Sequence, residues 1–104
     1  MPSILRTQQF AADLGVARAT GILFITDPIE DSFARGTLNV VGLEDVSFEA
    51  RVPGPPITIP INIGPAVITV TIRFDGLTRQ FEGRSEDADS EPGTAEWKKI
   101  VAVP

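Results

Sequence analysis

The sequence predicts a single all-β domain over residues 1–104, either an antiparallel β-barrel or a β-sandwich, with about seven to eight short strands. Apolar and polar side chains alternate with a period of two through much of the chain, as they do in half-buried strands. Turn-forming Gly, Pro and Asp residues recur at short intervals, and no strand–helix–strand alternation indicates a parallel sheet. At 104 residues, the chain is long enough for one hydrophobic core.

The N-terminal segment fits two interpretations. Residues 7–14, TQQFAADL, are compatible with a short helix that has Thr7 as its N-cap and Gly15 as its C-terminal stop. Phe10 and Leu14 would then share one side of that helix. The segment is equally compatible with an irregular lead-in to the first strand.

Residues 15–26, GVARATGILFIT, predict a long strand whose two faces are both partly apolar. Gly21 marks either a β-bulge or the close approach of another strand, because a strand glycine leaves room for a backbone. The apolar run from Ile22 to Ile25 indicates that both faces of this strand are buried. One face would pack on the core, and a subunit interface would bury the other.

Two further strands follow the polar turn at residues 27–32. Alternation over 34–40 and again over 46–52 predicts a hairpin that pairs Val40 with Val46 and aligns Leu38 with Phe48. The stiff segment 53–56, PGPP, then connects this hairpin to the centre of the domain.

A meander over residues 57–84 is the clearest element of the sequence. Gly64 and Pro65 predict a tight turn that pairs Ile63 with Ala66, which puts the isoleucines of this hairpin on one face. Pro60 lacks an N–H group on the opposite side of its strand, so we expect a sheet edge or a bulge there.

Asp75 and Gly76 predict a two-residue turn for the next hairpin, because both residue types tolerate positive φ. This register places Phe74 opposite Leu77 and Ile72 opposite Arg79. Arg79 would then lie on the apolar face of the meander. The other face is rich in Thr, Asn and Gln but has no aromatic residue of its own, as a solvated sheet face does.

The C-terminal part begins with a polar loop, SEDADSEPG, after Arg84. Residues 93–104 predict the last strand. One face of that strand would carry Ala95, Trp97, Lys99, Val101 and Val103.

Composition excludes several classes of function. The chain has no Cys and no His, so thiolate nucleophiles, Cys-based zinc sites and His-dependent acid–base catalysis within it are ruled out. A formal charge of −5 argues against a nucleic-acid backbone or an anionic membrane surface as the partner. No signal peptide or transmembrane segment is evident, which gives a cytoplasmic location as the default expectation, and we expect no cofactor.

Arg79 is the strongest candidate for a ligand-binding residue. A guanidinium on an apolar face needs a carboxylate or an anionic ligand, because an unpaired buried charge is costly. Asp27, Glu30 or Asp31 would supply the partner or, in an enzyme, the general base. The alternative is that Arg79 lies at the rim of the sheet and reaches water.

Acidic residues of the C-terminal loop form a second, weaker candidate. If neighbouring strands pair in order, Glu44, Asp45 and Glu86 lie at the same end of the sheet as this loop. Hard oxygen ligands of this kind suit calcium, although Pro92 and Lys98 do not fit an EF-hand. The alternative is a solvated acidic loop. The calcium candidates are Asp87, Asp89 and Glu91.

The leading interpretation is a non-enzymatic β domain that acts in binding or assembly, as a homo-oligomer or with another protein. The alternative is a β-barrel that binds a small apolar or anionic ligand, either as a carrier or as a His-independent isomerase, cyclase or lyase. The two differ in whether the interior of the domain is filled by side chains.

Overall fold

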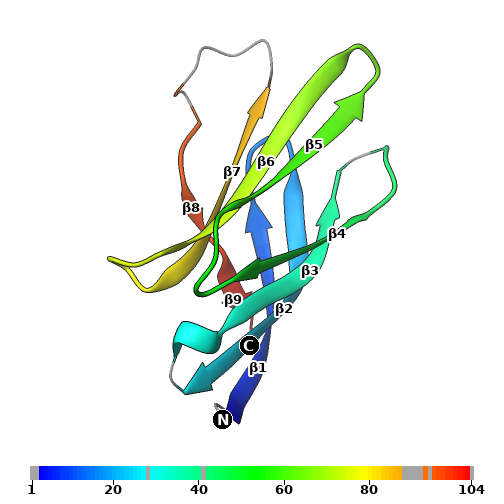
Figure 1. Cartoon of the computed structure of the whole chain (residues 1–104). Helices are drawn as coiled ribbons and strands as arrows, with labels where there is room; N and C mark the ends of the chain where they lie inside the picture. Colours follow the sequence, from blue (N-terminus) through cyan, green and yellow to red (C-terminus); the bar gives the residue numbers. More distant parts are fainter. Residues whose placement is uncertain (1–2, 28, 41, 88–92, 94, 104) are drawn as a thin grey trace.

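The computed structural model describes residues 3–27, 29–40, 42–87, 93 and 95–103. Its described residues are all-β, with strands and one short 3₁₀ turn. Figure 1 shows the strands in two layers. In chain order the elements are β1 (Ser3–Asp13), β2 (Arg18–Asp27), η1 (Ile29–Asp31), β3 (Phe33–Asn39), β4 (Val46–Arg51), β5 (Ile57–Ile63), β6 (Ala66–Asp75), β7 (Gln80–Asp87), β8 (Lys98–Lys99) and β9 (Val101–Val103).

Two antiparallel sheets make up the layers. The five-stranded sheet has the order β4-β3-β2-β1-β9, and the four-stranded sheet has the order β5-β6-β7-β8. Over the described residues the sheets stay separate and do not close into a barrel. The expected all-β, antiparallel architecture is therefore confirmed.

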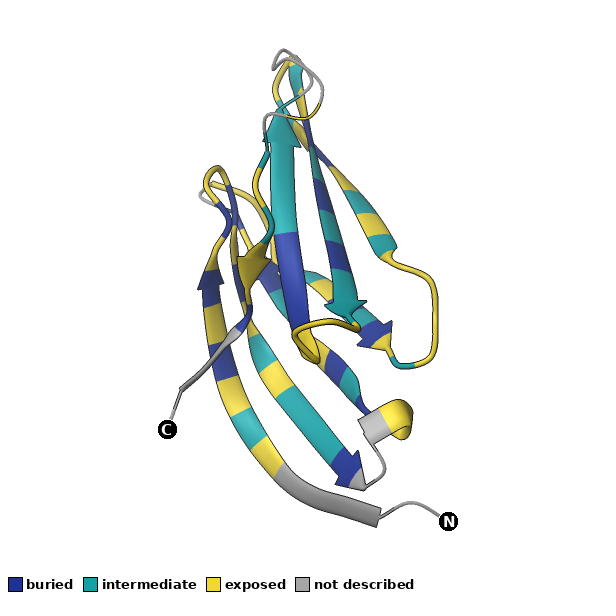
Figure 2. Cartoon of the chain, turned by 90° about the vertical axis from the view of Figure 1, so that its left-hand side faces the viewer, coloured by how far each residue is buried: buried dark blue, intermediate teal, exposed yellow. Residues whose placement is uncertain are grey.

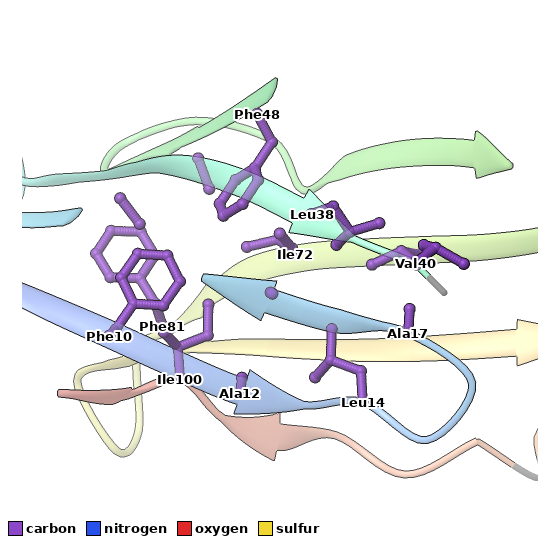
Figure 3. Close-up of a cluster of buried hydrophobic side chains, with 14 of the residues drawn as sticks. Phe10, Ala12, Leu14, Ala17, Leu38, Val40, Phe48, Ile72, Phe81 and Ile100 are labelled. Atoms are coloured by element: carbon purple, nitrogen blue, oxygen red, sulfur yellow. The ribbon is translucent and has the colours of Figure 1, made fainter. Parts of the chain in front are cut away.

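Side chains from both sheets meet in one core between the layers (Figure 3). Leu38 of the five-stranded sheet and Val70 and Ile72 of the four-stranded sheet are completely inaccessible to solvent. Figure 2 shows the expected alternation of buried and exposed positions along the strands.

The helix expected at residues 7–14 is wrong, because this segment belongs to strand β1. Phe10, Ala12 and Leu14 are buried while the residues between them are exposed. The spacing of four between Phe10 and Leu14 fits one face of a helix and also one face of a strand, so it could not separate the two. Gly15 has a φ of 89° in the β1–β2 turn, so it serves a hairpin rather than a helix end.

The β5–β6 hairpin has the predicted register, with Ile63 paired to Ala66 across the turn. Strand β5 is an edge strand of the four-stranded sheet, and Pro60 lies exposed within it. The expected sheet edge at Pro60 is therefore confirmed.

The predicted register of the β6–β7 hairpin is wrong by four residues. Asp75 pairs with Gln80, and a longer turn separates them. The Asp75 carboxylate accepts a hydrogen bond from the Leu77 N–H at 2.8 Å, which stabilises this wider turn. The observed register also brings Phe74 edge-on to Phe81, with ring centroids 5.3 Å apart.

The β3–β4 hairpin is shifted by two residues from its predicted register. Leu38 pairs with Val46, and Phe48 lies opposite Gly36. This register completes a row of four residues across β1 to β4, in which Phe10 pairs with Gly21, Gly21 with Gly36, and Gly36 with Phe48.

The row explains why two glycines occupy the centre of the sheet. Strands β1 and β4 are three strand spacings apart, or about 14 Å, yet the Phe10 and Phe48 ring centroids are only 6.0 Å apart. The rings can meet because Gly21 and Gly36 between them have no side chains. A Cβ on Gly21 would lie 2.3 Å from the Gly36 Cα, so the expected close approach of another strand at Gly21 is confirmed.

The predicted last strand is interrupted. β8 pairs with β7 in the four-stranded sheet, whereas β9 pairs with β1 in the five-stranded sheet. Ile100, between them, is buried and donates its N–H to the Phe81 carbonyl at 2.9 Å. The chain therefore passes from one layer to the other at Ile100, and the single face predicted for this strand is not maintained.

Candidate functional site

Arg79 does not lie on the apolar face. It is exposed in the β6–β7 turn, has a φ of 57°, and donates its N–H to the Asp75 carbonyl at 2.7 Å. The predicted pairing with Ile72 is wrong, because Ile72 lies opposite Gly83. The need for a buried counter-charge at Arg79 disappears with that register.

The carboxylates proposed as partners of Arg79 lie in another part of the molecule. Glu30 and Asp31 are exposed in η1, which packs beside β2, and Asp27 ends β2 with a side chain outside the described set. Among the described side chains, no ion pair joins Arg79 to Glu30 or Asp31. The structure therefore does not bring these four residues together as a site.

The calcium candidates fall largely outside the described residues. Asp87 ends β7 and is half-buried, while Asp89 and Glu91 lie outside the described set. Glu44 and Asp45 are exposed in the β3–β4 loop. Within the described ranges, no three acidic side chains come close enough to hold a metal ion.

The outer face of the five-stranded sheet is a more promising surface. Ile22 of β2 projects from it with 40% of its surface exposed. Phe24 and Phe33 are half-buried beside it, and their rings stack with centroids 4.8 Å apart. These aromatic rings come from paired positions of β2 and β3 and face away from the core.

Two shallow hollows flank Ile22 on this face. One lies toward β1 and is bordered by Gln9, Ala11 and Thr20. The other lies toward β3 and β4 and is bordered by Arg35, Thr37 and Ser47. Gly21 borders both hollows, and Gly36 borders the second.

A charged cluster borders the aromatic pair. Glu49 of β4 lies between two arginines, with its carboxylate 2.9 Å from Arg35 and 2.7 Å from Arg51. Hydrogen bonds from Arg51 and then Arg35 lower the pKa of the Glu49 carboxyl below its ordinary value. The Arg35 guanidinium also lies 5.4 Å from the Phe33 ring centroid, within the range of a cation–π contact.

We call this surface the β2–β3 patch. The sequence indicated Ile22 and Phe24 through the two apolar faces of their strand, but it did not indicate the others. Those residues look like ordinary solvent-facing positions of strands until the register places them beside Phe24. The patch comprises Ile22, Phe24, Phe33, Arg35, Glu49 and Arg51.

No family model, curated protein or solved structure matches the chain. Within the residues that the structure describes, no helix is long and apolar enough to cross a membrane. The chemistry of the described surfaces therefore carries the functional argument.

Proposed function

We propose that the chain is a β-sandwich domain whose work is binding and assembly rather than catalysis, and that the β2–β3 patch joins two copies into a homodimer. One observation carries the proposal: Ile22 stands exposed between two hollows, on a sheet face that no described element covers. Exposed apolar surface of this kind in a small domain commonly marks an interaction site.

The exposed Ile22 side chain and the two hollows beside it could fit against the same surface of a second copy. In a two-fold symmetric dimer, each contact between two residues occurs twice, so the patch must be complementary to itself. Ile22 of each copy can enter a hollow beside Ile22 of the other.

Local charge favours the same arrangement. The outward side of β1 to β4 carries Arg18, Arg35 and Arg51 against Asp13 and Glu49, a balance of about +1, whereas the whole chain has a formal charge of −5. Two copies therefore repel less through this face than through the rest of the surface. Glu49 can also accept a hydrogen bond from an arginine of the partner.

The size of the face sets the expected affinity. Five strands at about 4.8 Å spacing and seven residues at about 3.3 Å rise give roughly 20 by 23 Å, or about 450 Å² of flat area per copy. Specific interfaces bury about 600–1,000 Å² per partner, so this one lies at or below the small end of that range. We expect a weak dimer with a dissociation constant of about 10–100 μM.

Sedimentation velocity over about 5–500 μM protein tests the proposal. The wild-type chain should shift from monomer to dimer with concentration, and Ile22→Glu should stay monomeric throughout. Val67→Glu is the matched control, because Val67 is 38% exposed on the outer face of the other sheet. A wild-type chain that stays monomeric, or an Ile22→Glu variant that dimerises as well as the wild type, would contradict the proposal.

The alternative function, a small-molecule carrier or a His-independent isomerase, cyclase or lyase, has less support. It requires a barrel interior with Arg79 at its wall. The two sheets are separate, the space between them holds fully buried side chains such as Leu38 and Ile72, and Arg79 is exposed.

A further inference from the structure

Trp97 lies against the outer face of the four-stranded sheet, on the side opposite the β2–β3 patch. The guanidinium carbon of Arg73, on β6, is 3.6 Å from the Trp97 ring centroid, and that of Arg84, on β7, is 4.6 Å from it. Two arginines on different strands thus share one indole ring. The polar face that the sequence showed without an aromatic residue acquires one from the C-terminal segment.

The two arginines differ in how their charge is balanced. Arg73 pairs with Glu82 directly across the strands, with N and O atoms 3.4 Å apart. Among the described residues no carboxylate pairs with Arg84, whose described contact is the Trp97 ring. A half-buried guanidinium with no counter-ion among the described residues is unusual in a chain whose formal charge is −5.

The buried nitrogen atoms show which part of each guanidinium can reach a ligand. The Nε atoms of Arg73 and Arg84 are both buried and have no hydrogen-bond partner among the described residues. The Arg73 side chain nevertheless retains 36% of its exposure, and Arg84 is half-buried rather than enclosed. A ligand would therefore contact the terminal Nη groups, while the indole ring lies against the guanidinium carbons.

The charge at this face limits how much negative charge a ligand can carry. The register places Arg73, Arg84 and Lys99 on this side of the sheet together with Asp75, Glu82 and Glu86, so the three cations and the three carboxylates balance. A doubly charged phosphate or sulfate would face these three carboxylates, with no cation beyond Arg84 and the exposed Lys99 that lacks a carboxylate partner among the described residues. A planar carboxylate fits the fork of one guanidinium.

We propose that Arg84, supported by Arg73 and Trp97, binds a carboxylate ligand on the outer face of the four-stranded sheet. The carboxylate accepts hydrogen bonds from Nη groups, and the indole ring holds the guanidinium plane in place. This site is independent of the proposed dimer, because it lies on the other sheet. Its ligand is either a small organic acid or an acidic side chain of a peptide.

The sequence supplies its own reporter for this site. Trp97 is the one tryptophan and there is no tyrosine, so intrinsic fluorescence comes almost entirely from the indole that the arginines contact. The chain would be titrated with sodium acetate and with a hexaglutamate peptide. Sodium chloride and sodium sulfate at matched ionic strength are the reference salts. We expect a saturable change with a carboxylate and not with chloride.

Variants at Arg84 test whether the fluorescence change comes from carboxylate binding at this residue. Arg84→Gln should weaken carboxylate binding by about tenfold or more, and Arg84→Lys, which keeps the charge but loses the fork, should weaken it by a smaller factor. Arg18→Gln on the other sheet is the matched control and should titrate as the wild type does. Ile22→Glu should also bind normally, so failure of the dimer and failure of this site are distinguishable.

Each outcome of the titration decides the proposal. Equal responses to chloride and acetate would show only salt screening of the arginine–indole contacts and would overturn it. Tighter binding of sulfate than of acetate, or wild-type affinity in Arg84→Gln, would also overturn it. Saturable binding of acetate and the peptide supports the site. A peptide that binds much more tightly than acetate identifies an acidic peptide as the ligand, and comparable affinities identify a small acid.

Discussion

Replacing Gly21 with alanine tests the explanation of the glycine row. The new Cβ would lie 2.3 Å from the Gly36 Cα, 2.7 Å from the Arg35 carbonyl oxygen and 3.0 Å from the Phe10 ring. The first two contacts involve backbone atoms of the neighbouring strand, which cannot move without disturbing the β2–β3 ladder. Relief therefore requires that the two strands separate at the centre of the sheet.

The expected cost follows from this geometry. Adding one methyl group to a well-packed interior destabilises a protein by about 1–3 kcal/mol, and contact with backbone places Gly21→Ala at or above about 3 kcal/mol. Domains of this size have a free energy of unfolding of about 5–15 kcal/mol, so the variant would lose a large part of its stability. The melting temperature should fall by about 12–24 °C.

Urea unfolding, monitored by Trp97 fluorescence, measures how much Gly21→Ala lowers the free energy of unfolding. Gly76→Ala is the matched control, since nothing lies within 4 Å of the position where its Cβ would be. Its stability should change by no more than about 0.5–1 kcal/mol. If Gly21→Ala were as stable as Gly76→Ala, the close approach of β2 and β3 would not exist in solution and the explanation would be refuted.

Two further predictions concern the core and the acid stability. Ile72→Ala should lower the free energy of unfolding by about 2–5 kcal/mol in urea, because Ile72 is completely buried, whereas Val67→Ala on the exposed face should cost about 0.5 kcal/mol or less. The pKa of Glu49 is lower in the folded chain than its ordinary value of 4.5, so the stability contributed by its arginine contacts is present above pH 4.5 and is lost as pH falls through the folded pKa. Glu49→Gln should therefore lose less stability than the wild type between neutral pH and about pH 3, and an identical loss in both proteins would contradict the assignment.

The strands of the meander were predictable because local signals agree there. Alternation fixes which side of each strand faces the core, and the Gly64-Pro65 turn leaves one register for its hairpin. The edge at Pro60 follows from its missing N–H group. These features require only the covalent structure of the residues and their neighbours along the chain.

The errors in strand β1, in the β6–β7 turn and in the β3–β4 register share a cause, since each depended on a partner distant in the sequence. Strand β1 is a strand because β2 and β9 pair with it on its two sides. The wider β6–β7 turn depends on the contact between Phe74 and Phe81, and the β3–β4 register depends on the space that Gly36 leaves for Phe48. In both hairpins the shift was an even number of residues, so the residues that pair in the structure keep their predicted faces although their partners differ. Arg79 is different, because the wider turn removes it from the ladder.

The candidate sites were less accessible to the sequence than the fold. The site predicted at Arg79 depends on a register that the structure does not have. The alternation around Trp97 predicts a regular strand, whereas the ring of Trp97 lies against two arginines of the neighbouring polar face. The sequence by itself determined that the fold is all-β, which strand residues face inward, and that His and Cys chemistry is absent. The first two depend on the two-residue period of the hydrophobic pattern, and the third depends on composition. Only the tertiary structure decided which side chains meet on each outer face. Contacts between strands depend on register, and register depends on the shapes of side chains that are far apart in the chain.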